Sequence, residues 1–181
     1  MEIDTRARRI KLLAMDVDGV LTDGHIILGN QGEELKAFHV HDGLGINLAH
    51  KAGLHTAIIT GRESEIVRRR GTELNIRDIH QKVADKARCI KQMLAKYALT
   101  PDEVAFIGDD LNDVPLFLQV GLAAAVANAA PEAKQFAHVV TRARGGDGAV
   151  RELIALILKA QGKWEQIVEE YVNSPQRLIG Q

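Results

Sequence analysis

The chain contains 181 residues, of which 46% are apolar and 26% charged, and its formal net charge is −1. This length is typical of one domain, and the apolar content suffices for a sizeable core. We expect a single domain over residues 1–172, followed by a C-terminal tail over 173–181. The balanced charge speaks against a general basic surface for nucleic acid, and no apolar run approaches the length of a membrane span.

The lone cysteine and the N-terminal residues indicate where the protein works. Cys89 has no partner for an internal disulfide, which fits a reducing compartment. No base is placed beside it, so we interpret it as a small buried side chain and not as a nucleophile. Residues 1–9 are charged and lack the apolar core of a signal peptide. We therefore expect a cytoplasmic protein with neither nucleic-acid nor membrane partners.

Apolar runs alternate with helical patterns along the whole chain. The first half predicts a strand over 10–15, a hairpin with strands 25–28 and 35–39, a helix over 42–52 ended by Gly53, a strand over 56–59, a helix over 62–70 ended by Gly71, a strand over 76–80, a helix over 87–97 and a strand over 104–107. The second half predicts a short helix over 112–119, a strand over 122–126, a helix beginning at Pro131, an edge strand over 139–140 and a helix over 148–160 that continues through 164–171. This alternation is typical of an α/β fold with a parallel sheet flanked by helices.

Two carboxylates follow the first predicted strand directly. Asp16 and Asp18 stand two positions apart at the carboxyl end of the apolar run over 10–15. Oxygen ligands suit Mg²⁺, which commonly binds one or two carboxylates together with substrate phosphate. An aspartate can also attack phosphorus and form a covalent intermediate. The pair therefore favours phosphoryl chemistry over a structural role.

A second acidic cluster follows another buried-strand pattern. Residues 104–107 are apolar, and Asp109, Asp110 and Asp113 come directly after them. Ligands bind beyond the carboxyl ends of strands in open α/β sheets, so the two clusters meet if their strands are neighbours. Either cluster alone is equally compatible with a solvated loop or a helix cap. Together they predict one magnesium and phosphate site.

Between the acidic clusters lie a hydroxyl and two candidate cations. Thr60-Gly61-Arg62 follows the strand over 56–59, where a hydroxyl and the next backbone N–H can hold a phosphate oxygen. A plain N-cap threonine explains the same residues equally well. Lys86 opens a helix against the helix dipole, which makes sense if its ammonium reaches the anionic centre. Lys82 is a rival for that role on sequence grounds.

These residues carry a resemblance to a known family. DVDGVLTDG over 16–24, TGR over 60–62, Lys86 and GDDLND over 108–113 resemble the four motifs of the haloacid dehalogenase superfamily of phosphatases. FHVHDGLGI over 38–46, GDDLNDVP and TRARGGDGAVRE over 141–152 are similar to its small capless members, the 3-deoxy-D-manno-octulosonate (KDO) 8-phosphate phosphatases. The resemblance runs from about Lys11 to Lys163. His41 departs from the Arg or Lys expected before Asp42.

The resemblance implies a Rossmann-like parallel sheet with a protruding β-hairpin flap and no cap domain. It also implies site roles. Asp16 is the nucleophile, Asp18 the general acid and base, and Thr60 and Lys86 hold the transferring phosphoryl group. Mg²⁺ is bound by Asp16, the backbone carbonyl of Asp18, and Asp109. The remaining candidates contact substrate or orient the other site residues: Arg62, Asp110, Asp113, Gly145 and Gly146.

No gap between the motifs can hold a lid domain, so another part of the protein must cover the site. Neighbouring subunits are the economical solution, and the resembling family forms tetramers through its hairpins, with C-terminal tails reaching neighbouring sites. The strand over 25–28 is apolar for a protrusion, which suits an interface. Packing of the hairpin on its own domain is the alternative. We expect a homotetramer acting on a small sugar phosphate.

Other functions compete with this prediction. A phosphatase for a nine-carbon nonulosonate 9-phosphate differs only in sugar length. A phospho-accepting signalling domain shares the acidic residues, threonine and lysine but lacks a second aspartate such as Asp18. A catalytically idle scaffold would not need intact acidic motifs. His39 and His41 have the spacing of a transition-metal pair, although no third soft ligand accompanies them, and His41-Asp42 is an alternative contact for the sugar.

Overall fold

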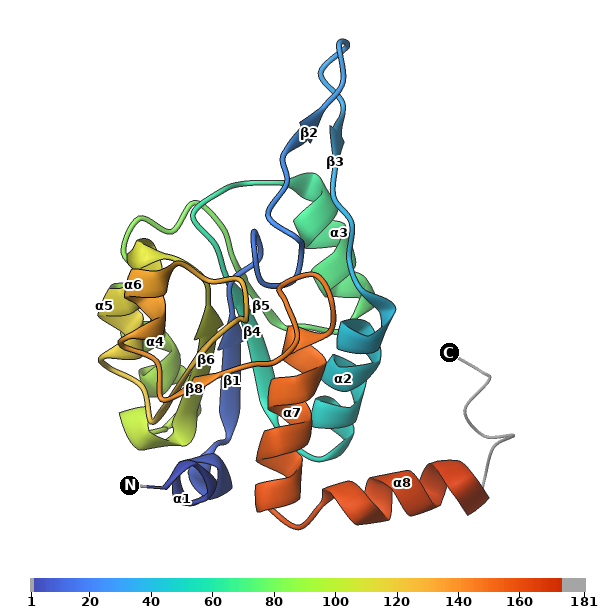
Figure 1. Cartoon of the computed structure of the whole chain (residues 1–181), viewed down its shortest axis with the longest axis vertical. Helices are drawn as coiled ribbons and strands as arrows, with labels where there is room; N and C mark the ends of the chain where they lie inside the picture. Colours follow the sequence, from blue (N-terminus) through green and yellow to red (C-terminus); the bar gives the residue numbers. More distant parts are fainter. Residues whose placement is uncertain (1, 174–181) are drawn as a thin grey trace.

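A six-stranded parallel sheet forms the centre of the molecule, for which the computed structural model describes residues 2–173. Its strand order is β5-β4-β1-β6-β7-β8 (Figure 1). The strands are β1 (Leu12–Met15), β4 (His55–Ile59), β5 (Asp78–His80), β6 (Val104–Gly108), β7 (Leu122–Ala125) and β8 (Val139–Val140). The α/β class and the parallel sheet are thereby confirmed, and β8 lies at the edge as predicted.

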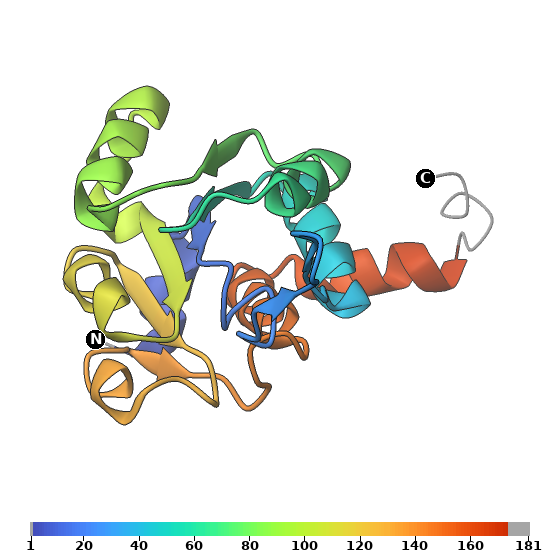
Figure 2. The ribbon, with the colours of Figure 1, turned by 90° about the horizontal axis from the view of Figure 1, so that it is seen from above.

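Helices cover both faces of this sheet (Figure 2). One face carries α2 (Val40–Lys51), α3 (Glu65–Glu73) and α7 (Ala149–Ala160), and the other carries α4 (Lys86–Tyr97), α5 (Val114–Phe117) and α6 (Pro131–Lys134). Short 3₁₀ turns η1 (Pro101–Glu103) and η2 (Leu111–Asp113) flank β6. No helix among residues 2–173 is long and apolar enough to cross a membrane.

The register of the three central strands determines where the polar residues meet. Met15 on β1 pairs with Ile58 on β4 and with Ile107 on β6. All three strands are buried almost throughout, which is why apolar and polar residues do not alternate along them. The residues that follow them therefore emerge together at the carboxyl edge of the sheet.

The predicted hairpin is present but shorter than expected. Its paired strands are β2 (Ile27–Leu28) and β3 (Glu34–Leu35), which form a separate antiparallel ladder projecting above the sheet (Figure 1). Residues 25–26 and 36–39 are not paired, because after Leu35 the chain turns down and Lys36 reaches into the site below. Ile26, Ile27, Leu28 and Leu35 are exposed, with Leu28 at 68%.

The helix boundaries near Gly71 and Gly162 differ from the prediction, and the helix expected over 112–119 is a 3₁₀ turn followed by the short α5. Helix α3 begins at Glu65 and runs through Gly71 to Glu73. Gly71 is not a helix end; it is buried where α3 packs on the sheet, and a Cβ there would lie 2.6 Å from Ile79 Cδ1. Helix α8 (Trp164–Asn173) is separate from α7, because the chain turns at Gly162, which has φ +68°.

The two ends of the chain also differ from the prediction. Helix α1 (Ile3–Arg9) was not predicted, and its one buried residue, Ala7, explains the weak signal. Asn173 ends α8, so it does not begin the predicted tail. Residues 174–181 of that tail lie outside the described part of the chain.

The close contact at Gly71 gives a stability test. We expect Gly71→Ala to lower the free energy of unfolding by about 1–3 kcal/mol, because overpacking against Ile79 outweighs the gain in helix propensity. Urea denaturation measures the change, with Arg69→Ala on the exposed face of α3 as the control. An unchanged or increased stability of Gly71→Ala would show that the helix shifts to accommodate the methyl group.

Candidate active site

A buried ammonium joins two carboxylates at the carboxyl edge of the sheet. Lys86 Nζ lies 2.5 Å from Asp16 Oδ2 and 2.6 Å from Asp113 Oδ1. The side chains of all three residues are at most 7% exposed. Lys86 is the first residue of α4, whose N-cap Asp85 accepts a hydrogen bond from Arg88 N. The unfavourable position of Lys86 at a helix start is thus explained by its two anionic partners.

The second acidic cluster is shaped by Asp113. Its Oδ2 accepts hydrogen bonds from the backbone N–H groups of Asp109 at 2.8 Å and Asp110 at 3.4 Å. A Cβ at position 108 would collide with this carboxylate, so Gly108 is needed for the loop to fold back on Asp113. Both oxygens of Asp113 are thereby engaged, and its side chain orients Lys86 and the loop.

The first acidic loop approaches Asp109 just as closely. Gly19 has φ +86°, and a Cβ there would collide with the Asp109 carboxylate. Oxygens of Asp16, Asp109 and Asp113 all lie within 4.8 Å of one another. Both oxygens of Asp16 are engaged as well, Oδ2 by Lys86 and Oδ1 by Val17 N at 2.6 Å. The cluster as a whole is therefore a candidate set of oxygen ligands for a hard cation.

Crowding of these carboxylates changes their acidity. Burial raises the pKa of Asp16 to about 6, with the charge of Asp113 acting in the same direction and Lys86 opposing it. Burial, followed by the charges of Asp113, Asp16 and Asp110, raises the pKa of Asp109 to about 7. Burial disfavours the charge of Lys86, yet its two carboxylate partners outweigh this and raise its pKa. The site therefore holds excess negative charge, which fits a divalent cation.

Asp18 is held by a cation from the hairpin. Lys36, one residue beyond β3, places Nζ 2.5 Å from Asp18 Oδ1, and its side chain is only 1% exposed. Arg62 Nε lies 3.8 Å from Asp18 Oδ2. The sequence did not single out Lys36, because a lysine in an expected hairpin strand is ordinarily solvated. The available signal was its position next to Leu35, which places the lysine side chain on the opposite, inward face of that strand.

The candidates in the loops after β4 and β5 differ in burial and in their contacts. Thr60 is buried, and its hydroxyl accepts a long hydrogen bond of 3.4 Å from Arg62 N. The helix expected to begin at Arg62 begins only at Glu65, so its N-terminus is not directly at Thr60. Lys82 pairs with Glu63 and its side chain is 70% exposed, whereas Lys86 is the lysine that contacts Asp16.

Comparison with known proteins places this geometry in a family. Residues 55–153 match the model of the haloacid dehalogenase-like hydrolases. The KDO 8-phosphate phosphatase KdsC of Yersinia pestis is 49% identical over 91% of this chain and 88% of its own length, and that of Escherichia coli K12 is 47% identical over the same shares. The chain belongs to the haloacid dehalogenase-like hydrolases and, among them, to the KDO 8-phosphate phosphatase family.

Solved structures agree with this assignment. A KDO 8-phosphate phosphatase from Moraxella catarrhalis, in complex with a magnesium ion, a phosphate ion and a KDO molecule, superposes with a TM-score of 0.92 at 41% identity. The match covers 93% of this chain and 97% of that one. The Yersinia pestis structure gives a TM-score of 0.89 at 49% identity, covering 90% and 88%.

The motifs over 38–46 and 141–152, which resemble the KDO 8-phosphate phosphatases in particular, pack against one another and against the first acidic loop. Asp42, in the first turn of α2, accepts a hydrogen bond of 2.7 Å from the backbone N–H of Arg151 in α7. Gly145 and Gly146 approach the backbone of the loop over 19–23 so closely that a Cβ on either would collide with it. Gly146 N also donates to Val20 O at 2.9 Å. These contacts hold the loop that follows Asp18.

The histidine pair is not arranged as a strand pair. His39 caps α2, accepting a hydrogen bond from His41 N, and the two rings meet edge to face with centroids 4.8 Å apart. His41 lies inside α2, which begins at Val40, so the two histidines do not share a strand. Asp147 Oδ1 lies 3.6 Å from His39 Nε2, but within residues 2–173 no third His, Cys, Asp or Glu lies close enough to both histidines to form a metal site with them.

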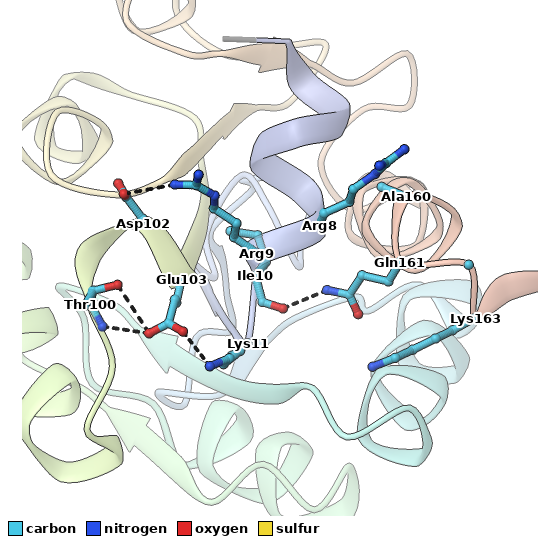
Figure 3. Close-up of a pocket in the computed structure, with 11 residues that line it drawn as sticks. Arg8, Arg9, Ile10, Lys11, Thr100, Asp102, Glu103, Ala160, Gln161 and Lys163 are labelled. Atoms are coloured by element: carbon cyan, nitrogen blue, oxygen red, sulfur yellow. Dashed lines mark hydrogen bonds and ion pairs between the residues drawn. The ribbon is translucent and has the colours of Figure 1, made fainter.

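A cavity of about 930 Å³ lies at the opposite end of the sheet from this phosphatase site (Figure 3). Its charged lining groups are largely paired with one another: Arg9 with Asp102 at 3.4 Å and Lys11 with Glu103 at 2.5 Å. Gln161 donates to Ile10 O at 2.7 Å and ties α7 to the end of α1. The cavity is an open hollow between elements and contains no acidic cluster for catalysis.

The raised pKa values predict how Mg²⁺ and pH act together. Protonated Asp16 and Asp109 favour the folded metal-free chain at low pH, and this contribution is lost as the pH rises through about 6 and 7. Mg²⁺ must displace these protons, so its affinity falls as the pH is lowered. We expect the Mg²⁺-induced rise in melting temperature to be larger at pH 8 than at pH 6. In Asp109→Asn the rise should be small at both values; an equal rise in the native chain at both values would contradict the predicted proton competition.

Proposed function

We propose that the chain is a Mg²⁺-dependent phosphatase that hydrolyses KDO 8-phosphate to KDO and inorganic phosphate, a step in the biosynthesis of lipopolysaccharide precursors. The observation that carries this proposal is the buried Asp16–Lys86–Asp113 arrangement beside Asp109, in a chain 49% identical to a KDO 8-phosphate phosphatase. The complex of the Moraxella catarrhalis relative with magnesium, phosphate and KDO supports the cofactor and the eight-carbon sugar over a nine-carbon one.

In the first step Asp16 attacks the phosphorus. A bond forms between its carboxylate oxygen and phosphorus, while the bond from phosphorus to the sugar oxygen breaks. Asp18 donates a proton to that oxygen as it leaves. Thr60 and Lys86 hold the transferring group, and Arg62, which reaches toward Asp18 on the exposed side, contacts the substrate. Asp16, the Asp18 backbone carbonyl and Asp109 would hold Mg²⁺, which when bound would offset the developing negative charge.

In the second step Asp18, now a carboxylate, takes a proton from water. The water oxygen bonds to phosphorus, the bond to Asp16 breaks, and inorganic phosphate leaves. Asp113 keeps Lys86 in place throughout, and Asp110 extends the same loop. Gly145 and Gly146 act by supporting the loop after Asp18. Because Asp18 promotes this hydrolysis, the aspartyl-phosphate is short-lived, as in an enzyme and unlike a signalling domain that retains its phosphate.

Removal of the nucleophile tests the proposed chemistry. We expect Asp16→Asn to lower kcat on KDO 8-phosphate by about four orders of magnitude or more, since an amide does not replace the attacking carboxylate. Phosphate release from 2-keto-3-deoxy sugar phosphates of eight and nine carbons measures both the loss and the substrate preference. Asp102→Asn, at the far end of the sheet, is the matched control and should keep full activity. If Asp16→Asn retained a tenth of native turnover, Asp16 would not be the nucleophile.

We further propose that the enzyme is a cytoplasmic homotetramer assembled through its hairpins. The exposed apolar side chains of β2 and β3 support this assembly, because such a protrusion gains stability when a neighbour covers it. Each hairpin would then be fixed above an active site that has no lid domain of its own, and neighbouring subunits would supply contacts to the sugar.

A charge on the hairpin tests the assembly. We expect Ile27→Asp to yield smaller species in light scattering, because the interface would bury an unpaired carboxylate. Its kcat/KM should fall far more for KDO 8-phosphate than for 4-nitrophenyl phosphate, whose small leaving group needs no neighbour. Leu118→Asp, at an exposed apolar position beyond α5, controls for the charge itself. A native monomer with full activity on the sugar phosphate would contradict the tetramer proposal.

A further inference from the structure

Lys36 is a buried cation that the four family motifs do not include. It stands on the hairpin, one residue after β3, and its side chain is 1% exposed. The ammonium lies 2.5 Å from Asp18 Oδ1 and 3.4 Å from Glu34 Oε1. A lysine is almost never so completely buried unless carboxylates pair with it. Its location is therefore determined by Asp18 and Glu34 together.

The contacts around Lys36 connect the hairpin to the rest of the site. Glu34, on β3, accepts a hydrogen bond of 2.9 Å from the Ser64 hydroxyl at the start of α3. Arg62 lies between the same two carboxylates, 3.8 Å from Asp18 and 3.9 Å from Glu34. Arg62 is about half exposed, whereas Lys36 is enclosed. Lys36 is thus the cation that fixes Asp18 from within, and Arg62 is the one open to substrate.

Asp18 has to serve two reactions from one position. It must point at the sugar oxygen in the first step and at the attacking water in the second, so a freely rotating carboxylate would be misplaced for much of the time. A charge-assisted hydrogen bond to a buried partner restricts that rotation. Lys36 Nζ provides this bond on Oδ1 and leaves Oδ2 facing Arg62.

We propose that Lys36 is a positioning residue for Asp18, through which the hairpin controls the hydrolysis of the aspartyl-phosphate. This inference rests on the proposed function, since it assumes the two-step reaction at Asp16. Lys36 acts through Asp18 and does not touch the transferring group. A hairpin displaced from the site would withdraw Lys36 and slow the reaction even with Asp16, Lys86 and Asp109 in place.

The test separates the two steps with 4-nitrophenyl phosphate, whose leaving group departs without a proton. Asp16 still forms a bond to phosphorus as the bond to nitrophenolate breaks, so the first step stays fast without a positioned Asp18. The second step still needs Asp18 to take a proton from water. We expect Lys36→Met to release a rapid burst of about one nitrophenolate per site, followed by turnover at least tenfold below native. Acid quenching should trap a phosphate adduct on Asp16, detected by mass spectrometry.

Three further variants keep the result decisive. Lys36→Arg restores a cation and should recover most of the turnover with little adduct. Lys36→Gln serves if Lys36→Met does not fold, and should show the same burst. Lys91→Met, at an exposed position on α4, should behave as native.

Slow turnover of the Lys36 variants without a burst or adduct would overturn the proposal, as would native turnover. A native enzyme that neither forms an adduct nor depends on Asp16 would instead overturn the proposed function.

Discussion

The bridge that Lys86 makes between Asp16 and Asp113 is the interaction on which the rest of the site depends. Three carboxylates from two loops lie within one small volume, and burial together with mutual repulsion opposes their charge. One enclosed ammonium offsets part of that cost. Breaking such a pair from one side exposes an uncompensated buried charge. The stability of the site and its readiness for a divalent cation therefore have the same origin.

The positions of glycines in the surrounding loops follow from the crowding of these carboxylates. Gly19 and Gly108 are glycines because the Asp109 and Asp113 carboxylates occupy the space where a Cβ would lie. Gly145 and Gly146 allow a third loop to close on the first. The hairpin enters the same arrangement through Lys36, which pairs with Asp18, the proposed general acid and base. The far end of the sheet, where Arg9 and Asp102 pair beside an open hollow, lies away from this site.

Much of this arrangement could be predicted from the sequence, and the exceptions have physical causes. The buried parallel strands have unmistakable apolar runs, and an aspartate directly after each of β1 and β6 places both clusters at one edge. Lys86 was favoured by its conflict with the helix dipole. Gly71 was misread as a helix end because sequence alone does not reveal that α3 needs a close approach to Ile79. Lys36 was missed because a lysine on a predicted hairpin gives no sign that a carboxylate distant along the chain encloses it. The short paired region of the hairpin reflects the same contact.

A double-mutant cycle between Lys86 and Asp113 tests the central claim most directly. Unfolding of the metal-free native chain, Lys86→Met, Asp113→Asn and the double variant would be followed in urea at pH 8. We expect Lys86→Met alone to lose about 3–5 kcal/mol, since it leaves two buried carboxylates without their counter-ion. The double variant should lose about 2 kcal/mol less than the sum of the single losses, because the two residues act as one unit. Losses that simply add would contradict the claim that this buried bridge holds the site together.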